Sequence, residues 1–158
     1  DIREKMVKKS ITNFFNDYLK EVSVYGELIN RKITTENLVT KNIELPFNEQ
    51  LLHRALENLF SNARRYTKDG DSIQLKLHIE GSNLIFAMKD YGCGIAKEDL
   101  KNIFDLFFRG TNSRLEKGMG IGLSVVKNII STHGWTINVD SEKGIGSTFS
   151  IIIPLEQE

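Results

Sequence analysis

Two clusters of glycines in the second half of the chain constrain its fold more than any other feature. The first is Gly92 and Gly94 in DYGCGI, which follows LIFAM, an apolar run typical of a strand. The second is Gly118, Gly120 and Gly122 in GMGIGL. Between them lies IFDLFFRG, with aromatic and basic residues. Two places where the backbone can turn freely and approach a ligand closely, joined by such a loop, predict a nucleotide pocket with a lid.

Each cluster suits a different part of a nucleotide. Asp90, just before the first cluster, can accept a hydrogen bond from an exocyclic amine, and glycines with positive φ would let a flat base lie against the backbone. The second cluster precedes apolar residues at helical spacing, so its N–H groups would face phosphate at a helix N-terminus. Either cluster alone is more often an ordinary turn, and the prediction depends on their combination.

Composition excludes several classes of protein. The chain has 158 residues, enough for one domain with a real core. Lys plus Arg and Asp plus Glu each number 21, so no basic excess indicates a nucleic-acid partner. The single cysteine, Cys93, excludes an internal disulfide, and no apolar run approaches the ~20 residues of a membrane span. Because the chain opens at Asp1 without a signal peptide, we expect an excised fragment.

An amphipathic helix is predicted near the start of the chain. Apolar residues fall at helical spacing from Ile11 to Leu28, and Gly26 is expected to end or weaken the helix. It is either a surface helix of the domain or the end of a helical stem over residues 1–28, and both alternatives remain open. NRKITTENLV and KNIELP are then predicted to be strands, with Pro46 closing the second.

A second helix, from Phe47 to Tyr66, is predicted to pack its apolar stripe on the core. Asn58 and Asn62 are four residues apart and share one face, with Arg65 and Tyr66 one turn beyond Asn62. Two solvated asparagines would explain this pair without any site. However, asparagine is a mediocre helix former, and its carboxamide oxygen is a suitable ligand for magnesium.

The remaining stretches alternate apolar and polar residues. SIQLKLHIEGSNLIFAMKD is predicted to be a β-hairpin around residues 81–83, and TINVDSEKGIGSTFSIIIPLE a second hairpin around Lys143 and Gly144. About five strands and three main helices result, with the helices on one face of a mixed, mostly antiparallel sheet. The predicted fold class is α+β, a two-layer sandwich, in a single domain over residues 1–158.

Five blocks of the chain then match a known family in order. ENLFSNARRYT, DYGCGI, IFDLFFRG, GMGIGL and GIGSTF resemble the N, G1, F, G2 and final G-T-x-F boxes of the catalytic, ATP-binding domain of sensor histidine kinases. These belong to the GHKL superfamily, shared with gyrases, mismatch-repair ATPases and heat-shock chaperones. The resemblance covers Glu44 to Pro154. It implies the GHKL ATP-binding fold, with ATP and Mg²⁺ as cofactors.

The resemblance also implies roles for individual residues. Asn62 resembles the asparagine that holds magnesium against the triphosphate, and it is the one implied metal ligand. Asp90 resembles the aspartate that recognises the adenine amino group. Arg65 stands at a basic phosphate contact, and Arg109 resembles the basic lid residue that reaches the phosphates. The other positions implied to bind nucleotide are Asn58, Tyr66, Gly92, Gly94, Ile95, Phe107, Gly118, Gly120, Ile121, Gly122, Leu123 and Ser147.

A lid is predicted over Thr111–Lys117, mobile when no nucleotide is bound. The segment is polar, has one apolar residue, Leu115, and ends at a glycine, so little burial opposes its conformational entropy. The resemblance implies that Phe107 and Phe108 anchor it.

The chain departs from the family at three places. His133-Gly134-Trp135 stands where two glycines usually follow the histidine, and Ser147 replaces the usual threonine but keeps a hydroxyl. The third departure is an absence. None of the three histidines has the context of a phosphoacceptor H box, which carries an acidic neighbour ahead of the catalytic domain. Each of them, His53, His78 and His133, is expected to be structural, so no catalytic residue is predicted in this chain.

The activity implied is that of a protein-histidine kinase. The domain would bind Mg-ATP and donate the γ-phosphate to a histidine on a separate dimerisation and phosphotransfer domain, which this chain lacks. Two alternatives share the pocket: a stand-alone GHKL serine kinase of the anti-sigma-factor type and a GHKL ATPase module. A third, a module that holds nucleotide without chemistry, is disfavoured by the intact boxes.

The residue at one position separates the first two alternatives from the kinase. Both typically place a glutamate four residues before the magnesium asparagine, where this chain has Asn58. Glu57 is one residue away and so rotated by ~100° around the helix. Because a carboxamide cannot act as a general base at neutral pH, the histidine-kinase interpretation is favoured.

Partners and location follow from the resemblance alone. The partners would be the phosphoacceptor domain of the same parent protein and a response regulator downstream, with no nucleic acid. The parent is expected to be a homodimer in the cell membrane. This chain would be its cytoplasmic domain and a monomer by itself.

Overall fold

The computed structural model describes residues 5–105 and 122–155. Within these ranges, every helix is too short or too polar to cross a bilayer. The elements, in chain order, are β1 (Val7–Ser10), α1 (Ile11–Ser23), α2 (Gly26–Ile29), β2 (Lys32–Asn37), β3 (Glu44–Phe47), α3 (Glu49–Tyr66), β4 (Ser72–Glu80), β5 (Asn83–Asp90), α4 (Lys97–Leu100), α5 (Gly122–Thr132), β6 (Thr136–Glu142) and β7 (Gly146–Pro154).

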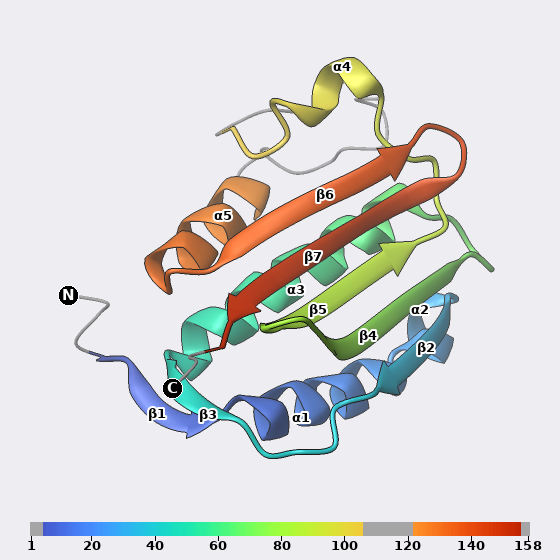
Figure 1. Ribbon diagram of the computed structural model, residues 1–158. Helices are drawn as coiled ribbons and strands as arrows, with labels where there is room; N and C mark the ends of the chain where they lie inside the picture. Colours follow the sequence, from blue (N-terminus) through green and yellow to red (C-terminus); the bar gives the residue numbers. More distant parts are fainter. Residues whose placement is uncertain (1–4, 106–121, 156–158) are drawn as a thin grey trace.

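Five strands form the main sheet, in the order β2-β4-β5-β7-β6 (Figure 1). β2 runs parallel to β4, and the other three pairs are antiparallel. Along β5, every second side chain is buried, because successive residues of a strand point to opposite faces of the sheet. The two predicted hairpins and the mixed, mostly antiparallel sheet are confirmed.

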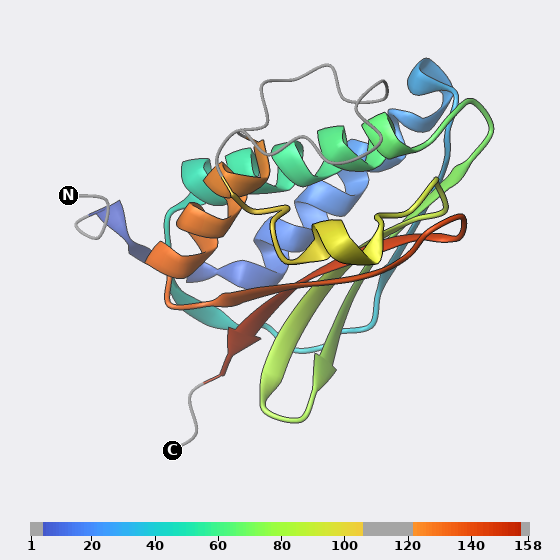
Figure 2. The ribbon, with the colours of Figure 1, turned by 90° about the horizontal axis from the view of Figure 1, so that it is seen from above.

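Helices α1, α3 and α5 all cover the same face of this sheet (Figure 2). The apolar stripes of the helices meet the buried face of the strands. Phe15 of α1 stacks on Phe86 of β5 with ring centroids 4.9 Å apart, and Leu56 and Leu59 of α3 are fully buried. Each such side chain contributes about 1.5 to 3 kcal/mol by leaving water. The predicted two-layer α+β sandwich is confirmed.

The first helix is shorter than predicted. Instead of running from Ile11 to Leu28, α1 ends at Ser23, and a separate turn of helix, α2, begins at Gly26. The N–H of Arg31 donates to the carbonyl of Gly26 at 3.0 Å, closing a loop that returns the chain into β2. Gly26 therefore starts α2 rather than ending a long helix. The spacing of apolar residues along the sequence does not reveal this hydrogen bond, so it could not predict where the helix ends.

The strand predicted at KNIELP has an unpredicted partner. β3 pairs antiparallel with β1 in a two-stranded sheet beside the main one. Pro46 lies inside β3, opposite Lys8, rather than closing the strand. Because β3 has a neighbour on one side only, its other edge tolerates a residue without an N–H. β1 spans four residues, too few for alternation to predict it.

The start of α3 is held by a residue distant in sequence. The side chain of Asn48 caps the helix by accepting from the N–H of Leu51 at 3.0 Å. The N–H of Asn48 in turn donates to Nε2 of His133 at 3.0 Å, and Nδ1 of His133 lies 2.8 Å from the carbonyl of Ile129. His133 therefore joins the start of α3 to the end of α5, and its burial lowers its pKa.

The turn after α5 needs only one of the two glycines usual in the family. Gly134 has a φ of 80°, in the left-handed region, and its N–H donates to the carbonyl of Ser131. The N–H of Trp135 donates to the carbonyl of Ile130 at 3.1 Å. The turn thus closes with Trp135 in place of the second glycine.

Candidate nucleotide-binding site

Four of the predicted site residues lie near the end of α3: Asn58, Asn62, Arg65 and Tyr66. Asn62 is only 7% exposed, and its Nδ2 has no hydrogen-bond partner among the residues that the structure describes. Leaving a buried amide donor unpaired costs about 1 to 3 kcal/mol, so such a group calls for an explanation. A ligand that accepts from Nδ2 would supply one. Asn58, Arg65 and Tyr66 are half-buried.

The end of α3 is locked by Arg31, a residue that the sequence did not single out. The guanidinium of Arg31 donates to the hydroxyl of Thr67 at 2.8 Å and to the carbonyls of Arg64 and Thr67 at 3.1 and 3.0 Å. It also pairs with Asp69 at 3.2 Å. A cation at a helix C-terminus satisfies the last carbonyls and complements the helix dipole. Arg31 thereby fixes the last turn, which carries Arg65 and Tyr66.

Asp90 ends β5 as a buried carboxylate, only 1% exposed. Its Oδ1 accepts from the N–H of Gly92 at 3.1 Å. Burial raises the pKa of Asp90 to about 6, while the N–H groups of Gly92 and Ser147 lower it and the charge of Asp71 raises it. A desolvated carboxylate held by backbone donors is a strong, precisely oriented acceptor. Such an acceptor can recognise an exocyclic amine by accepting a hydrogen bond from it.

The glycines after Asp90 approach the chain's own backbone, which gives a second reason for them beside the predicted contact with a base. A Cβ at Gly92 would fall well inside contact distance of the carbonyl of Tyr66, and one at Gly94 would collide with the carbonyl of Glu142. Of these two glycines, Gly94 alone has a positive φ, 71°. Close packing against α3 and β6 therefore explains both glycines without invoking a ligand.

Hydrogen bonds from two sides hold this loop in place. The N–H of Cys93 donates to the carbonyl of Tyr66 at 3.0 Å, and the carbonyl of Cys93 accepts from Gly144 at 2.7 Å. The loop thus connects the end of α3 to the β6–β7 hairpin. It brings the predicted adenine residues, Asp90 to Ile95, beside the predicted phosphate residues of α3.

Two serines complete the region around Asp90, the predicted adenine end of the site. Ser147 lies opposite Asp90 in the register of β5 and β7, and it is buried. Its Oγ lies 2.7 Å from Oγ of Ser141, which accepts from the N–H of Ile95 at 2.8 Å and donates to the carbonyl of Gly146 at 3.0 Å. Ser141 was not predicted, because it belongs to no motif and only the β6–β7 pairing brings it to Ile95.

The remaining predicted residues lie at the start of α5 or outside the described ranges. Gly122 and Leu123 form the first turn of α5. The residues outside are Phe107, Phe108, Arg109, Gly118, Gly120 and Ile121, together with the predicted lid, Thr111–Lys117.

The part of the chain that contains α3, the Asp90 loop and the β6–β7 hairpin matches a known family. Residues 47–157 match the family described as histidine kinase-, DNA gyrase B- and HSP90-like ATPases. The match covers well over half of the chain. The chain belongs to this GHKL ATPase family. The predicted resemblance to the catalytic, ATP-binding domain of sensor histidine kinases is confirmed.

Curated relatives of this GHKL domain are named as sensor proteins or sensor-like histidine kinases. The chain is 38% identical to the sensor-like histidine kinase SenX3 of Mycobacterium bovis over 84% of its own length and 35% of the relative. It is 35% identical to the sensor protein RprX of Bacteroides fragilis over 98% of its own length and 30% of the relative. The chain therefore spans about a third of the length of these relatives.

Solved structures of histidine kinases share the fold. The mycobacterial sensor histidine kinase MprB superposes with a TM-score of 0.75 over 94% of this chain and 97% of that one, at 21% identity. A nucleotide-free catalytic domain of the histidine kinase ThkA also gives 0.75, over 94% and 97%, at 23% identity. At such identities the likeness establishes the GHKL fold and no more.

Proposed function

We propose that this GHKL domain binds Mg-ATP and donates the γ-phosphate to a histidine on a separate dimerisation and phosphotransfer domain, in two-component signal transduction. Asp90 would accept from the adenine amino group, and Asn62 would face the phosphates. The buried carboxamide of Asn62 fits magnesium, because its oxygen is a hard ligand. Its Nδ2, which has no partner among the described residues, would donate to a phosphate oxygen. When bound, the ion would neutralise charge on the phosphates.

The position of Glu57 favours the histidine-kinase reaction over the serine-kinase and ATPase alternatives. Its Oε2 accepts from the hydroxyl of Tyr18, on α1, at 3.1 Å. Glu57 is therefore directed toward α1, away from the face of α3 that presents Asn58 and Asn62. The serine kinases and ATPases of the family need a carboxylate in the place of Asn58 to orient or deprotonate the attacking group. With a carboxamide there, the nucleophile is best supplied by another domain.

The wider setting belongs to the same proposal. The sensor kinases that this chain resembles are about three times as long as the chain. We place the phosphoacceptor histidine in the remainder of the parent protein, with a response regulator downstream. The parent would be a homodimer in the cell membrane, and this domain would lie in the cytoplasm.

Incubation with γ-labelled ATP tests the proposal. The chain alone should bind ATP without labelling itself, because positioning and charge without a nucleophile give no transfer. Adding the preceding helical domain of its own parent protein should give label on that domain. The label should be lost in acid and kept in alkali, as expected of a phosphoramidate.

The two alternatives give different results in the same experiment. Acid-stable label on a serine of a partner protein would favour the serine-kinase class. Rapid release of phosphate with no protein labelled would favour the ATPase class. The matched variant Asn62→Ala should abolish transfer in each case, which ties the activity to this site rather than to a contaminant.

A further inference from the structure

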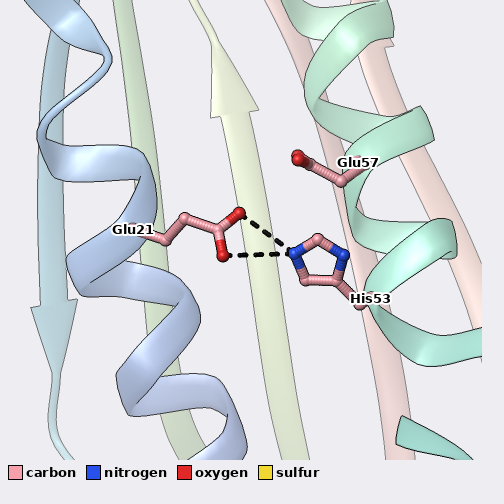
Figure 3. A group of neighbouring side chains, drawn as sticks. All are labelled: Glu21, His53 and Glu57. Atoms are coloured by element: carbon pink, nitrogen blue, oxygen red, sulfur yellow. Dashed lines mark hydrogen bonds and ion pairs between the residues drawn. The ribbon is translucent and has the colours of Figure 1, made fainter. Parts of the chain in front are cut away.

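A second group of polar side chains lies between α1 and α3, away from the nucleotide site. Glu21 projects from α1, and His53 and Glu57 project from successive turns of α3 toward it (Figure 3). Nε2 of His53 lies 3.0 and 3.2 Å from the two carboxylate oxygens of Glu21. One ligand atom from each of the three residues lies within 4.8 Å of the others. One imidazole nitrogen and two carboxylates thus converge on one point.

The carboxylate of Glu57 is oriented by a buried neighbour. The hydroxyl of Tyr18 donates to Oε2 of Glu57 at 3.1 Å and so helps to fix the position of this carboxylate. Burial, together with the charge of Glu57, raises the pKa of Tyr18 well above its usual range, so this donor stays protonated. A ligand carboxylate that is hydrogen-bonded from behind is the usual arrangement around a protein-bound metal.

The charge around the group favours a cation. The Glu21 carboxylate, followed by burial and then by the charge of Glu57, raises the pKa of the half-buried Tyr25, as expected beside two negative charges. Glu21 and His53 line a depression between α1 and α3, whose lining also includes Asp17, Glu49 and Gln50. Of these, Glu49 is paired with Lys9 at 2.7 Å.

The group is accessible from solution. The side chains of His53 and Glu21 are 41% and 35% exposed. An ion could therefore reach Nε2 without any opening of the fold, and a water could complete the coordination. These exposures also mean that replacing His53 or Glu21 leaves the core intact.

We propose that Glu21, His53 and Glu57 bind a divalent transition-metal ion, with Zn²⁺ as the best fit. Imidazole combined with carboxylate suits zinc and its neighbours, whereas magnesium and calcium prefer oxygen ligands only. Three protein ligands leave a fourth position for water.

The zinc site is independent of the proposed nucleotide chemistry. At 100° per residue, Asn62 lies about 180° around α3 from His53, on the far side of the helix. The ion would bridge α1 to α3 and so stabilise the packing of α1. A failure of either proposal therefore leaves the other standing.

Titration of the metal-free chain with Zn²⁺ by calorimetry, without nucleotide, tests the site. One ion should bind per chain, and the midpoint of thermal unfolding should rise. His53→Ala, Glu21→Gln and Glu57→Gln should each weaken binding at least tenfold. Tyr18→Phe keeps all three ligands and removes only the orienting hydroxyl, so it should weaken binding by about tenfold.

Matched controls decide whether the ion binds here. His78→Ala removes a half-buried histidine of β4, which is paired with Glu80 at 3.5 Å and belongs to no three-ligand group among the described residues. Cys93→Ser removes the thiol. Neither should change Zn²⁺ affinity. The proposal is overturned if the wild-type chain shows no saturable binding, if His53→Ala binds as well as wild type, or if Cys93→Ser abolishes binding. Paramagnetic broadening by Co²⁺ in NMR spectra should likewise centre on His53.

Discussion

Asp90 and Asn62 are both buried polar side chains, yet their surroundings differ. Asp90 is surrounded by backbone donors from Gly92 and Ser147, and its loop is bonded to α3 on one side and to the β6–β7 hairpin on the other. Asn62 lies on a helix whose two ends are fixed, but its own Nδ2 finds no partner in the described residues. One end of the candidate site is complete without a ligand. The other end is not.

This difference has a physical meaning. A preformed acceptor at the predicted adenine end should bind without rearrangement, because folding has already ordered it. At the predicted phosphate end, around Asn62, a donor without a partner among the described residues leaves an interaction that a ligand could satisfy. The free energy of unfolding should therefore respond mainly to changes near Asp90, and ligand affinity mainly to changes at Asn62.

The largest expected effect is that of Gly92→Ala. A Cβ there would collide with the carbonyl of Tyr66, and both sides of this contact are backbone, which cannot step aside cheaply. The free energy of unfolding should fall by about 3 kcal/mol or more. Urea denaturation of the two chains measures the difference.

Gly81→Ala is the matched control. Gly81 has a φ of 62° but nothing within 4 Å of an added Cβ, so its cost is one of conformation alone. About 1 to 2 kcal/mol is expected. If Gly92→Ala were no worse than Gly81→Ala, the close packing of the loop against α3 would not be what holds the adenine end.

Asp90→Asn should show how much the buried charge of Asp90 lowers the free energy of unfolding. Because folding raises the pKa of Asp90 from 3.8 to about 6, its charge destabilises the fold fully above pH 6. That cost disappears as the pH falls from about 6 to 3.8. The wild-type chain should therefore gain about 2 to 3 kcal/mol relative to Asp90→Asn between pH 7 and pH 4. A difference that does not change with pH would contradict the buried charge.

The same variant tests base recognition. With Asp90 in place, ATP should bind more tightly than GTP, because guanine presents a carbonyl where adenine presents an amine, and facing acceptors cost about 1 to 3 kcal/mol. Asp90→Asn should lose this preference. Calorimetric titration of both chains with both nucleotides measures it, and equal affinity of the wild-type chain for ATP and GTP would remove Asp90 from this role.

At the phosphate end, Asn62→Ala should act on binding rather than on folding. It removes a buried donor that has no partner in the part of the chain that the structure describes, so the free energy of unfolding without ligand should change by less than about 1 kcal/mol. Affinity for Mg-ATP should fall tenfold or more. Asn58→Ala, four residues away on the half-buried part of the same face, is the matched control and should have a much smaller effect. Equal binding by both variants would show that the metal assignment is wrong.

Local patterns predicted most of the fold, and motifs supplied the candidate site residues, which stay a prediction. Alternation and helical spacing are local, so the hairpins, α3 and α5 could be predicted from them. Contacts between distant segments could not. Arg31 closes the end of α3 from a loop 33 residues away, and Ser141 meets Ile95 across 46 residues. Neither belongs to a motif, and only the folded topology brings them there.

His133 is a third such contact, and it gives the smallest predicted effect. Nδ1 faces the carbonyl of Ile129 as a donor, and Nε2 accepts from the N–H of Asn48 at the start of α3. Only the neutral ring can do both, because protonation would set a donor on Nε2 against the N–H. Burial lowers the pKa of His133 below its usual 6.5, so its stabilising contribution is complete above pH 6.5 and lost as the pH falls further.

The measurement compares the wild-type chain with His133→Gln from pH 7.5 to 5. Because Asp90 is present in both chains, its titration cancels in the difference between them. The wild-type chain should lose stability relative to the variant as the pH falls, by about 1 kcal/mol or less. Mg-ATP affinity should stay nearly constant, since His133 holds the end of α3 far from Asn62. A parallel loss of affinity would mean that the start of α3 is coupled to the phosphate end, and that the two ends of the site are not independent.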